Sequence, residues 1–213
     1  MGKRIQNRLD TQAAIFDAAA GLIDQQGYDN TSVEEICDAA GVGRATFFRY
    51  FETKAGLLRE HNRRLTQDAA ARLARLPSTD VGAGAQLRVV ADAIHDAWMS
   101  AGPGRRDLGR NAAALADPTG ARTHPELIQL VLEIVRQGLA SGELRTNLSP
   151  PLAAYLVVIH LAGAAGWWFE HPDDDLHLLL RDSLDQCLNG IAGSLPPTAG
   201  TDHRPAPSVT FSG

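Results

Sequence analysis

Basic and aromatic side chains are concentrated in a short stretch near the N-terminus. Arg44, Arg49, Tyr50 and Lys54 lie within eleven residues of one another. Guanidinium and ammonium groups bind phosphate oxygens, and an arginine can also bond to O6 and N7 of one guanine. The chemistry that this stretch indicates is recognition of a nucleic acid, because no spacing of a nucleophile, a base and an orienting group is found in the chain.

The residues around this stretch predict how it is held. Ser32 stands three residues before Glu35, which is the spacing of a capping box at the start of a helix. Gly41 is expected to end that helix, and a second short helix is predicted over Arg44–Phe51. Two short helices joined by a turn that contains glycine form a helix-turn-helix, whose second helix fits the major groove of DNA.

The rest of the chain also predicts helices. Leu9–Gln26 carries apolar residues at helical spacing and is followed by Gly27. Further helices are expected over residues 53–76, 87–99, 107–116, 125–140, 149–170 and 175–191. With no alternating strand pattern, the expected fold is all-α: a helix-turn-helix DNA-binding domain (residues 1–55), a helical ligand-binding and dimerisation domain (56–194) and a disordered tail (195–213) rich in Pro, Thr, Ser and Gly.

The net charge of −5 does not exclude DNA as a partner. Residues 1–64 hold nine Lys or Arg and nine Asp or Glu, so the acidic excess lies in the remainder of the chain. The placement of basic groups on one face decides whether phosphates are attracted, and the total charge does not.

Over residues 32–54, and more loosely over Leu9–Glu60, the chain resembles the tetracycline-repressor (TetR) family of bacterial transcription regulators. Ser141-Gly-Glu-Leu-Arg145, followed by Ser149-Pro150, is also similar to C-terminal domains of that family. The resemblance implies a cytoplasmic, nucleoid-associated homodimer that binds a palindromic operator in double-stranded DNA. It further implies a repressor, not an enzyme, that an unknown small-molecule effector releases, and it implies no cofactor.

From the resemblance and from side-chain chemistry, we expect DNA contacts from Lys3, Arg4, Arg8, Thr31, Ser32, Arg44, Ala45, Thr46, Phe48, Arg49, Tyr50 and Lys54. Arg44 is expected to point at the groove floor, and Thr46 and Lys54 stand at positions similar to phosphate contacts of the family. Lys3, Arg4 and Arg8 are expected to form a basic arm that follows the backbone or enters the minor groove.

Two positions depart from the family pattern. Gly43 stands where a serine cap is frequent, which weakens the helix start by only a few tenths of a kcal/mol. Phe48 stands where tyrosine is usual, so a hydroxyl contact to phosphate is replaced by an apolar group that can meet a thymine methyl. Both departures affect which operator sequence the protein recognises, and they leave the predicted class of protein unchanged.

The predicted ligand-binding domain is the second part of the chain to consider. The resemblance implies a pocket behind Pro77, and aromatic and histidine side chains suit a largely apolar cavity; the candidates are His95, Trp98, Met99, Tyr155, His160, Trp167 and Trp168. Ordinary core or dimer packing explains each of these residues as well. The segments Tyr155–Phe169 and Leu176–Leu188 are the expected dimer interface, with packing inside a monomer as the alternative.

Other functions find weaker support. Residues 81–85 resemble a nucleotide-binding turn, but no strand precedes them. Asp173, Asp174 and Asp175 between two histidines suggest either a metal site or an acidic helix start, and the second interpretation is preferred, so no metal is expected. The apolar run Leu152–Phe169 has the length of a membrane span, but His160 and its small residues favour a buried helix and no membrane contact. A protein-binding scaffold would leave the basic residues unexplained.

Overall fold

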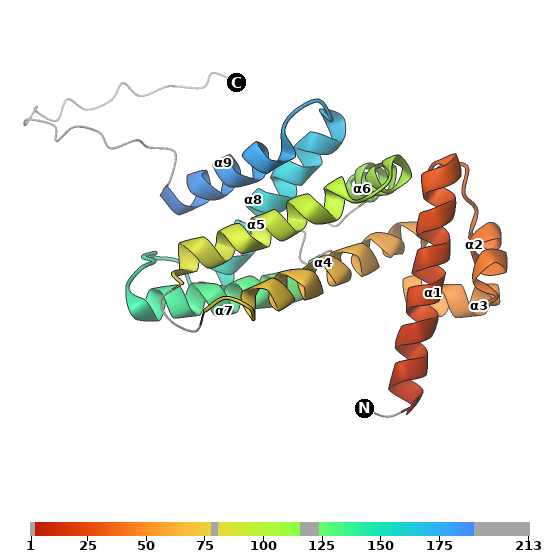
Figure 1. The fold of residues 1–213 in the computed structure, drawn as a ribbon, viewed down its shortest axis with the longest axis horizontal. Coiled ribbons are helices and arrows are strands. Elements are labelled where there is room, and N and C mark those ends of the chain that lie inside the picture. Colours follow the sequence, from red (N-terminus) through yellow and green to blue (C-terminus); the bar gives the residue numbers. More distant parts are fainter. Residues whose placement is uncertain (1–2, 78–80, 116–123, 190–213) are drawn as a thin grey trace, which may run out of the picture.

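The computed structural model describes residues 3–77, 81–115 and 124–189, and every regular element among them is a helix (Figure 1). The all-α prediction is thereby confirmed for this part of the chain. The elements are α1 (Lys3–Gln26), α2 (Val33–Ala40), α3 (Arg44–Phe51), the 3-10 helix η1 (Lys54–Gly56), α4 (Leu57–Leu73), α5 (Ala83–Met99), α6 (Pro103–Leu115), α7 (Pro125–Ser141), α8 (Pro150–Glu170) and α9 (Leu176–Asn189).

Helices α1, α2 and α3 form a small unit at one end of the molecule, and α4 leads from it into a bundle made of α4 to α9 (Figure 1). The small unit has its own core, in which Ile15, Ile36, Phe47 and Phe51 are at most 1% exposed. Val42, in the turn between α2 and α3, packs partly buried against that core. These residues hold the helix-turn-helix together, because apolar burial fixes the angle between its short helices.

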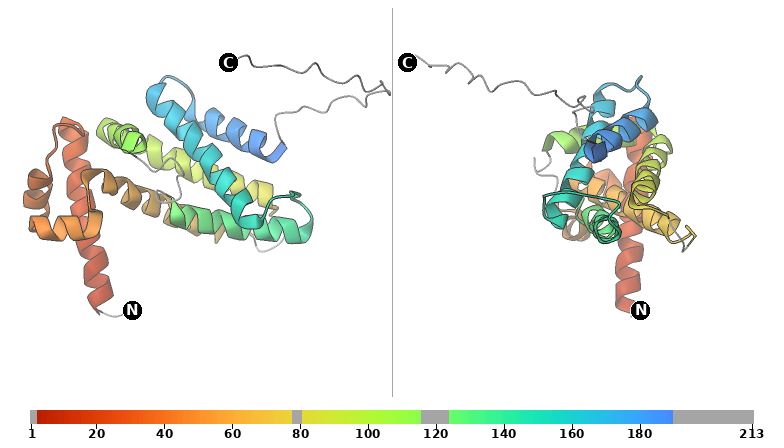
Figure 2. Two further views of the ribbon diagram at one scale, coloured as in Figure 1. Left: turned by 180° about the vertical axis from the view of Figure 1, so that it is seen from behind. Right: turned by 90° about the vertical axis from the view of Figure 1, so that its left-hand side faces the viewer.

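The first helix is longer than the sequence pattern predicted. It begins at Lys3 and not near Leu9, and Figure 2 shows its N-terminal part extending beyond α2 and α3. Lys3, Arg4 and Arg8, which were expected to form a basic arm before the first helix, all lie within it, and their contact with DNA stays a prediction. The backbone that carries these basic residues is helical and not extended.

Two boundaries in the bundle also differ from the sequence-based expectation. Thr53 caps η1 by accepting a hydrogen bond from the Gly56 amide (3.1 Å), and α4 begins only at Leu57. The helix expected from residue 107 begins four residues earlier, since Pro103 is the first residue of α6. Proline is tolerated there because the first amides of a helix have no intrahelical partner. The proposed disordered tail lies outside the described residues.

Helix α8 packs against α7 and α9 and supplies Val158, Leu161 and Trp168 to the core of the bundle. Among the described helices, it is the one long and apolar enough to cross a membrane by length and composition, and 44% of its most apolar window is buried in the bundle. The core helix of a bundle has the same composition. The apolar character of α8 therefore carries no separate argument for a membrane.

Candidate nucleic-acid interface

The turn between α2 and α3 has the geometry that the sequence predicted. Ser32 and Glu35 form a reciprocal capping box: the Ser32 hydroxyl accepts from the Glu35 amide (3.1 Å), and Glu35 Oε2 accepts from the Ser32 amide (2.8 Å). Hydrogen bonds from Ser32 and from Gln26 lower the pKa of the Glu35 carboxyl. Gly41 ends α2 with φ 64°, a left-handed conformation that glycine adopts without strain.

The outer face of α3 is available to solvent. Arg44, Ala45, Phe48 and Arg49 are exposed, whereas Phe47 on the opposite side is completely buried. Arg44 is the first residue of the helix and forms an ion pair with Glu34 of α2, while its guanidinium carbon lies 5.8 Å from the Phe48 ring centre. The α3 face therefore presents two guanidinium groups and an exposed aromatic ring, which is the chemistry that reads base edges and phosphates.

A groove of about 460 Å³ separates α1 from the end of α3, and its lining is basic and polar. Arg8 and Arg49 lie on either side of Tyr50, with their guanidinium carbons 6.0 and 5.1 Å from the ring centre. Asn7 and Thr11 complete the groove. This arrangement brings Arg8 of the first helix next to the recognition helix, which the sequence could not show because the two are 41 residues apart.

Thr31 does not suit the role that the sequence suggested. Its side chain is 1% exposed, and its hydroxyl donates to the Gly27 carbonyl (2.8 Å), so it cannot reach a phosphate. Ser32 is exposed, but its hydroxyl also serves the capping box. Thr46 is half-buried in α3. Of these three hydroxyl groups, Thr31 is removed from the predicted interface by burial.

Lys54 has a structural task besides any contact with DNA. Its Nζ donates to the carbonyl oxygens of Tyr28 and Thr31 and lies 4.0 Å from the Tyr28 ring centre. Burial lowers the pKa of Lys54, and the nearby Asp29 charge partly opposes this. Lys54 therefore ties η1 to the turn between α1 and α2, and its binding of phosphate stays a prediction.

A buried carboxylate joins the helix-turn-helix unit to α4. Glu60 is 1% exposed and accepts hydrogen bonds from Gln12 of α1 (3.0 Å) and from Arg63 and Arg64. These hydrogen bonds and charges lower the pKa of Glu60 against the effect of burial. Arg64 also binds Asp17 of α1 (2.7 Å). The start of α4 is thus held to α1 by a charged network, which sequence spacing alone did not reveal.

A second connection joins α1 to α6. The Asp24 carboxylate accepts from the backbone amide of Arg105 (3.1 Å) and from its Nε (3.0 Å). A Cβ atom placed on Gly104 would lie 1.8 Å from the Ile23 carbonyl oxygen, so the first turn of α6 rests directly on the backbone of α1. Helices α1, α2 and α3, called the recognition unit below, are therefore connected to the bundle both through α4 and through α6.

The structure does not bring the seven candidate ligand residues together. Trp98 and Trp168 are buried, Met99 and Trp167 are about half exposed, and His160 is exposed. Trp167 stacks on His171 and donates to Asp174. The half-buried Tyr155 lies on α8 as well, and His95 of α5 lies near His177 of α9, with ring centres 5.2 Å apart. Trp98 and Trp168 thus lie in the core of the bundle, whereas His160 lines a groove of about 530 Å³ between α5, α7, α8 and α9.

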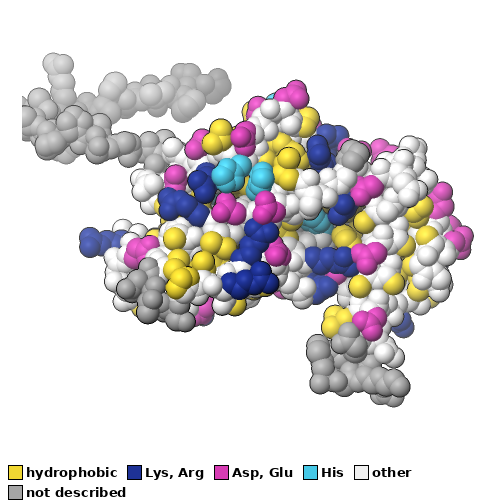
Figure 3. Space-filling model, in the orientation of Figure 1, with side chains coloured by type: hydrophobic (Ala, Val, Ile, Leu, Met, Phe, Trp, Pro, Cys, Tyr) yellow, Lys and Arg dark blue, Asp and Glu magenta, His cyan; other side chains and the backbone are white. Residues whose placement is uncertain are grey.

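On the surface of the bundle, several basic side chains are paired with acidic ones. On the face seen in Figure 3, basic and acidic side chains lie next to one another, with histidines among them. The ion pairs of this surface agree, since Arg72 binds Asp96 (2.6 Å) and Arg88 binds Asp185 (3.0 Å). At the start of α9, the Asp175 carboxylate accepts from the amides of His177 and Leu178, which is the helix-start role expected for the aspartate cluster.

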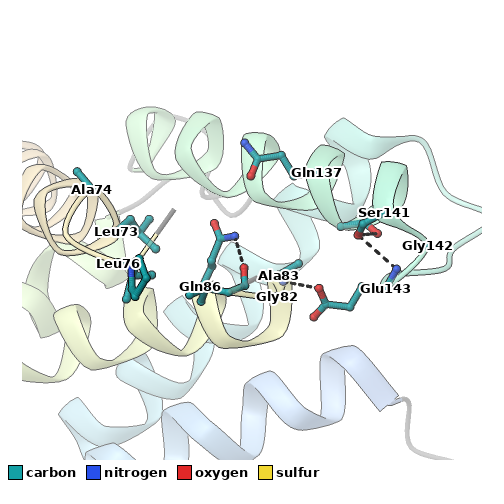
Figure 4. Close-up of a pocket in the computed structure, with 13 residues that line it drawn as sticks. Leu73, Ala74, Leu76, Gly82, Ala83, Gln86, Gln137, Ser141, Gly142 and Glu143 are labelled. Atoms are coloured by element: carbon teal, nitrogen blue, oxygen red, sulfur yellow. Dashed lines mark hydrogen bonds between the residues drawn. The ribbon is translucent and has the colours of Figure 1, made fainter. Parts of the chain in front are cut away.

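The far end of the bundle holds a groove of about 840 Å³ between α4, α5 and α7 (Figure 4). Glu143 lies at its edge and caps α5: its carboxylate accepts from the amides of Ala83 (2.6 Å) and Gly84 (2.9 Å). These hydrogen bonds lower the pKa of Glu143. This contact explains the Ser141-Gly-Glu stretch, because the turn at Gly142 (φ 79°) carries Glu143 back to α5.

Replacing Glu143 by alanine is expected to lower the free energy of unfolding by about 1 kcal/mol, because two amides at the start of α5 lose their acceptor. Chemical unfolding at neutral pH measures this loss. The contribution is present above the carboxyl pKa of the unfolded chain and disappears as the pH falls through the lower folded value. Glu133→Ala, an exposed change on α7, is the control; equal stability of both variants would contradict the cap.

Comparison with known proteins agrees with this arrangement. Residues 15–61 match the model of the family described as bacterial regulatory proteins, tetR family. YvkB of Bacillus subtilis (strain 168), an uncharacterized HTH-type transcriptional regulator, is 44% identical over 48 residues, which are 22% of this chain and 25% of YvkB. YdeS of the same organism, also an uncharacterized HTH-type transcriptional regulator, is 27% identical over 153 residues, which are 69% of this chain and 74% of YdeS.

Among solved structures, the TetR-family repressor FadR of Thermus thermophilus, in complex with lauroyl-CoA, has a TM-score of 0.67 and 25% identity. The match covers 89% of this chain and 100% of FadR, so the likeness extends through the whole bundle. The matched residues 15–61 contain α2, α3 and the core that holds them. Residues 15–61 therefore carry the sequence pattern of the tetR family of bacterial regulatory proteins, and the fold of the chain is similar to that of a solved TetR-family repressor.

Proposed function

We propose that the protein is a transcriptional repressor that binds a palindromic operator as a homodimer and leaves it when a small molecule binds the bundle. The observation that carries this proposal is the exposed face of α3, where Arg44 and Arg49 stand free of the core on a helix held by Phe47 and Phe51. Such a helix fits the major groove, and two copies about 34–36 Å apart read two half-sites. The place of action is then the bacterial cytoplasm.

Dimerisation is supported by the outer side of α8 and α9. Leu152 and Trp167 on α8 and Leu178 on α9 are between 44% and 56% exposed. A Cβ atom added to Gly163 or Gly166 on α8 would meet nothing within 4 Å, so the backbone there is open to close approach by a second helix. Apolar area of this kind on two neighbouring helices favours burial against a second copy.

Release by a ligand is supported by the two connections between bundle and recognition unit. A ligand that shifts α4 or α6 changes the position of α1 through Glu60 or through Arg105, and with it the separation of the two α3 helices. A coupling of about 1–3 kcal/mol is typical of such systems. The FadR structure holds lauroyl-CoA, and a small-molecule effector for this chain is proposed on the same pattern.

Electrophoretic retardation of DNA fragments that flank the protein's own gene tests the function, with footprinting to locate the operator and light scattering to measure the mass in solution. We expect a retarded fragment, a protected palindrome and the mass of a dimer. An enzyme or a protein-binding scaffold would leave every fragment unmoved, and that result would end the proposal.

Replacing Arg44 by alanine is expected to weaken operator binding by about 1–3 kcal/mol and to relax the base preference at one operator position, because a bidentate contact to a base is lost. Fluorescence anisotropy with the operator and with single-base variants measures both effects. Arg136→Ala, an exposed change on α7, should alter neither. If Arg44→Ala keeps full affinity and preference, the orientation assigned to α3 is incorrect.

A further inference from the structure

Two buried nitrogen atoms inside the bundle have no hydrogen-bond partner. Within the described part of the chain they are Nε2 of His61, on α4, and Nε of Arg106, on α6. His61 is 7% exposed, so its ring is almost entirely enclosed. Buried polar groups in folded proteins are nearly always bonded, because leaving one unpaired is unfavourable. This pair therefore needs an explanation that the fold itself does not supply.

Aromatic rings form a continuous path between the two nitrogens. The His61 ring centre lies 4.1 Å from that of Trp98, which lies 4.7 Å from Phe169 in an edge-on arrangement. Phe169 lies 5.9 Å from Trp168, and the Arg106 guanidinium carbon lies 5.2 Å from the Trp168 ring centre. All three hydrophobic rings are buried. The region is thus an aromatic interior with one polar atom at each end.

The charges of the two ends differ. Burial, together with the charges of Arg105, Arg64 and His124, lowers the pKa of His61 to about 4, so its imidazole is neutral near pH 7. Arg106 carries a guanidinium, which is cationic in proteins, and its Nε has no hydrogen-bond partner in the described part of the chain. A guanidinium N–H donates its strongest hydrogen bonds to anionic acceptors. A neutral imidazole nitrogen can bond to a hydroxyl, which can both donate and accept.

We propose that His61 and Arg106 are the two polar anchors of the effector site, and that the effector is an aromatic acid with a hydroxyl at the opposite end. The carboxylate binds Arg106, the hydroxyl binds His61, and the aromatic ring lies against Trp98, Trp168 and Phe169. This assignment rests on the ligand-responsive function proposed above and names the chemical class of the ligand.

The position of Arg106 also connects this site to the recognition unit. Arg105, the preceding residue, holds Asp24 of α1 through its amide and its Nε. An anion that draws Arg106 inward therefore acts on the same helical turn that fastens α1. Effector binding and the loss of DNA affinity are coupled through one turn of α6.

Isothermal calorimetry of the full chain with 4-hydroxycinnamate, cinnamate and laurate tests the site. We expect the wild-type protein to bind 4-hydroxycinnamate more tightly than cinnamate, which lacks the hydroxyl, and to bind laurate least. Arg106→Met should weaken both aromatic acids about tenfold or more, since a charged hydrogen bond is lost. His61→Phe should weaken 4-hydroxycinnamate alone, and Arg136→Met is the matched surface control.

Several results would overturn the assignment. They are no heat from 4-hydroxycinnamate at millimolar concentration, equal affinity in the wild-type, His61→Phe and Arg106→Met proteins, or tighter binding of laurate than of both aromatic acids. Arg106→Lys keeps the charge but lacks the Nε–H, and it replaces the methionine variant if circular dichroism shows the latter unfolded. DNA retardation without any acid is measured alongside: if DNA binds and the acids do not, only the ligand assignment fails, whereas unbound DNA removes the proposed function.

Discussion

Replacing Gly104 by alanine is expected to lower the melting temperature of the protein by about 6–12 °C. The added Cβ would lie 1.8 Å from the carbonyl oxygen and 2.3 Å from the carbonyl carbon of Ile23, both backbone atoms that no rotamer change can move. The first turn of α6 must therefore retreat from α1, which also stretches the contact between Arg105 and Asp24. Overpacking of this severity costs about 3 kcal/mol or more, and each kcal/mol shifts the melting temperature by roughly 2–4 °C at this chain length.

The matched control lies in the helix on the other side of this contact. Gly21 in α1 has nothing within 4 Å of a Cβ position, so Gly21→Ala should leave the melting temperature unchanged or raise it through better helix propensity. Differential scanning calorimetry of both variants at one protein concentration makes the comparison. A wild-type melting temperature for Gly104→Ala would mean that α6 does not rest on α1.

Lowering the pH from 8 to 5 is expected to reduce the free energy of unfolding by roughly 4 kcal/mol through two histidines. Burial lowers the pKa of His61 and of His124 from the ordinary 6.5 to about 4. In the unfolded chain both side chains take up protons as the pH falls through 6.5, while in the folded protein they stay neutral until about pH 4. The unfolded state therefore gains protons over this window, and each group removes roughly 2 kcal/mol of stability by pH 5.

Urea unfolding at pH 8, 6.5 and 5, at constant protein concentration, measures this dependence. His61→Phe keeps an aromatic ring beside Trp98 and removes one titrating group, so the decrease should shrink by about half. The carboxyl groups of Glu60, Glu143 and Asp96 have lowered pKa values, and their effects fall at more acidic pH. If wild type and His61→Phe lose the same stability between pH 8 and pH 5, the imidazole of His61 is not held neutral by burial.

Both variants act on the part of the molecule where regulation is proposed. Gly104 lies against the backbone of Ile23 and Asp24 in α1, two residues before Arg106, and His61 lies near the start of α4, next to Glu60 in sequence. The same helices thus carry stability and communication with the recognition unit. Measuring DNA affinity alongside stability separates the two, since a loss of folding lowers binding for every sequence while an altered α3 separation changes the preferred operator spacing.

The local elements were predictable from the sequence. The capping box at Ser32, the glycine turn at Gly41 and the bounds of α3 agree with the expectation. Such features depend on residues three or four positions apart, which a linear pattern displays directly. The family assignment followed from the same stretch.

Contacts between distant segments were not predictable, and they decide which candidate residues can act. The sequence suggested Thr31 as a phosphate ligand, but its side chain is buried in the structure. Lys3, Arg4 and Arg8 were expected in an arm before the first helix, but they belong to α1. The partners Glu60–Gln12, Asp24–Arg105 and Glu143–Ala83 are separated by 48, 81 and 60 residues. The side chains that line one interior, or that stay without a partner inside it, depend on how helices pack, and helix packing is set by the fit of whole surfaces and not by any spacing along the chain.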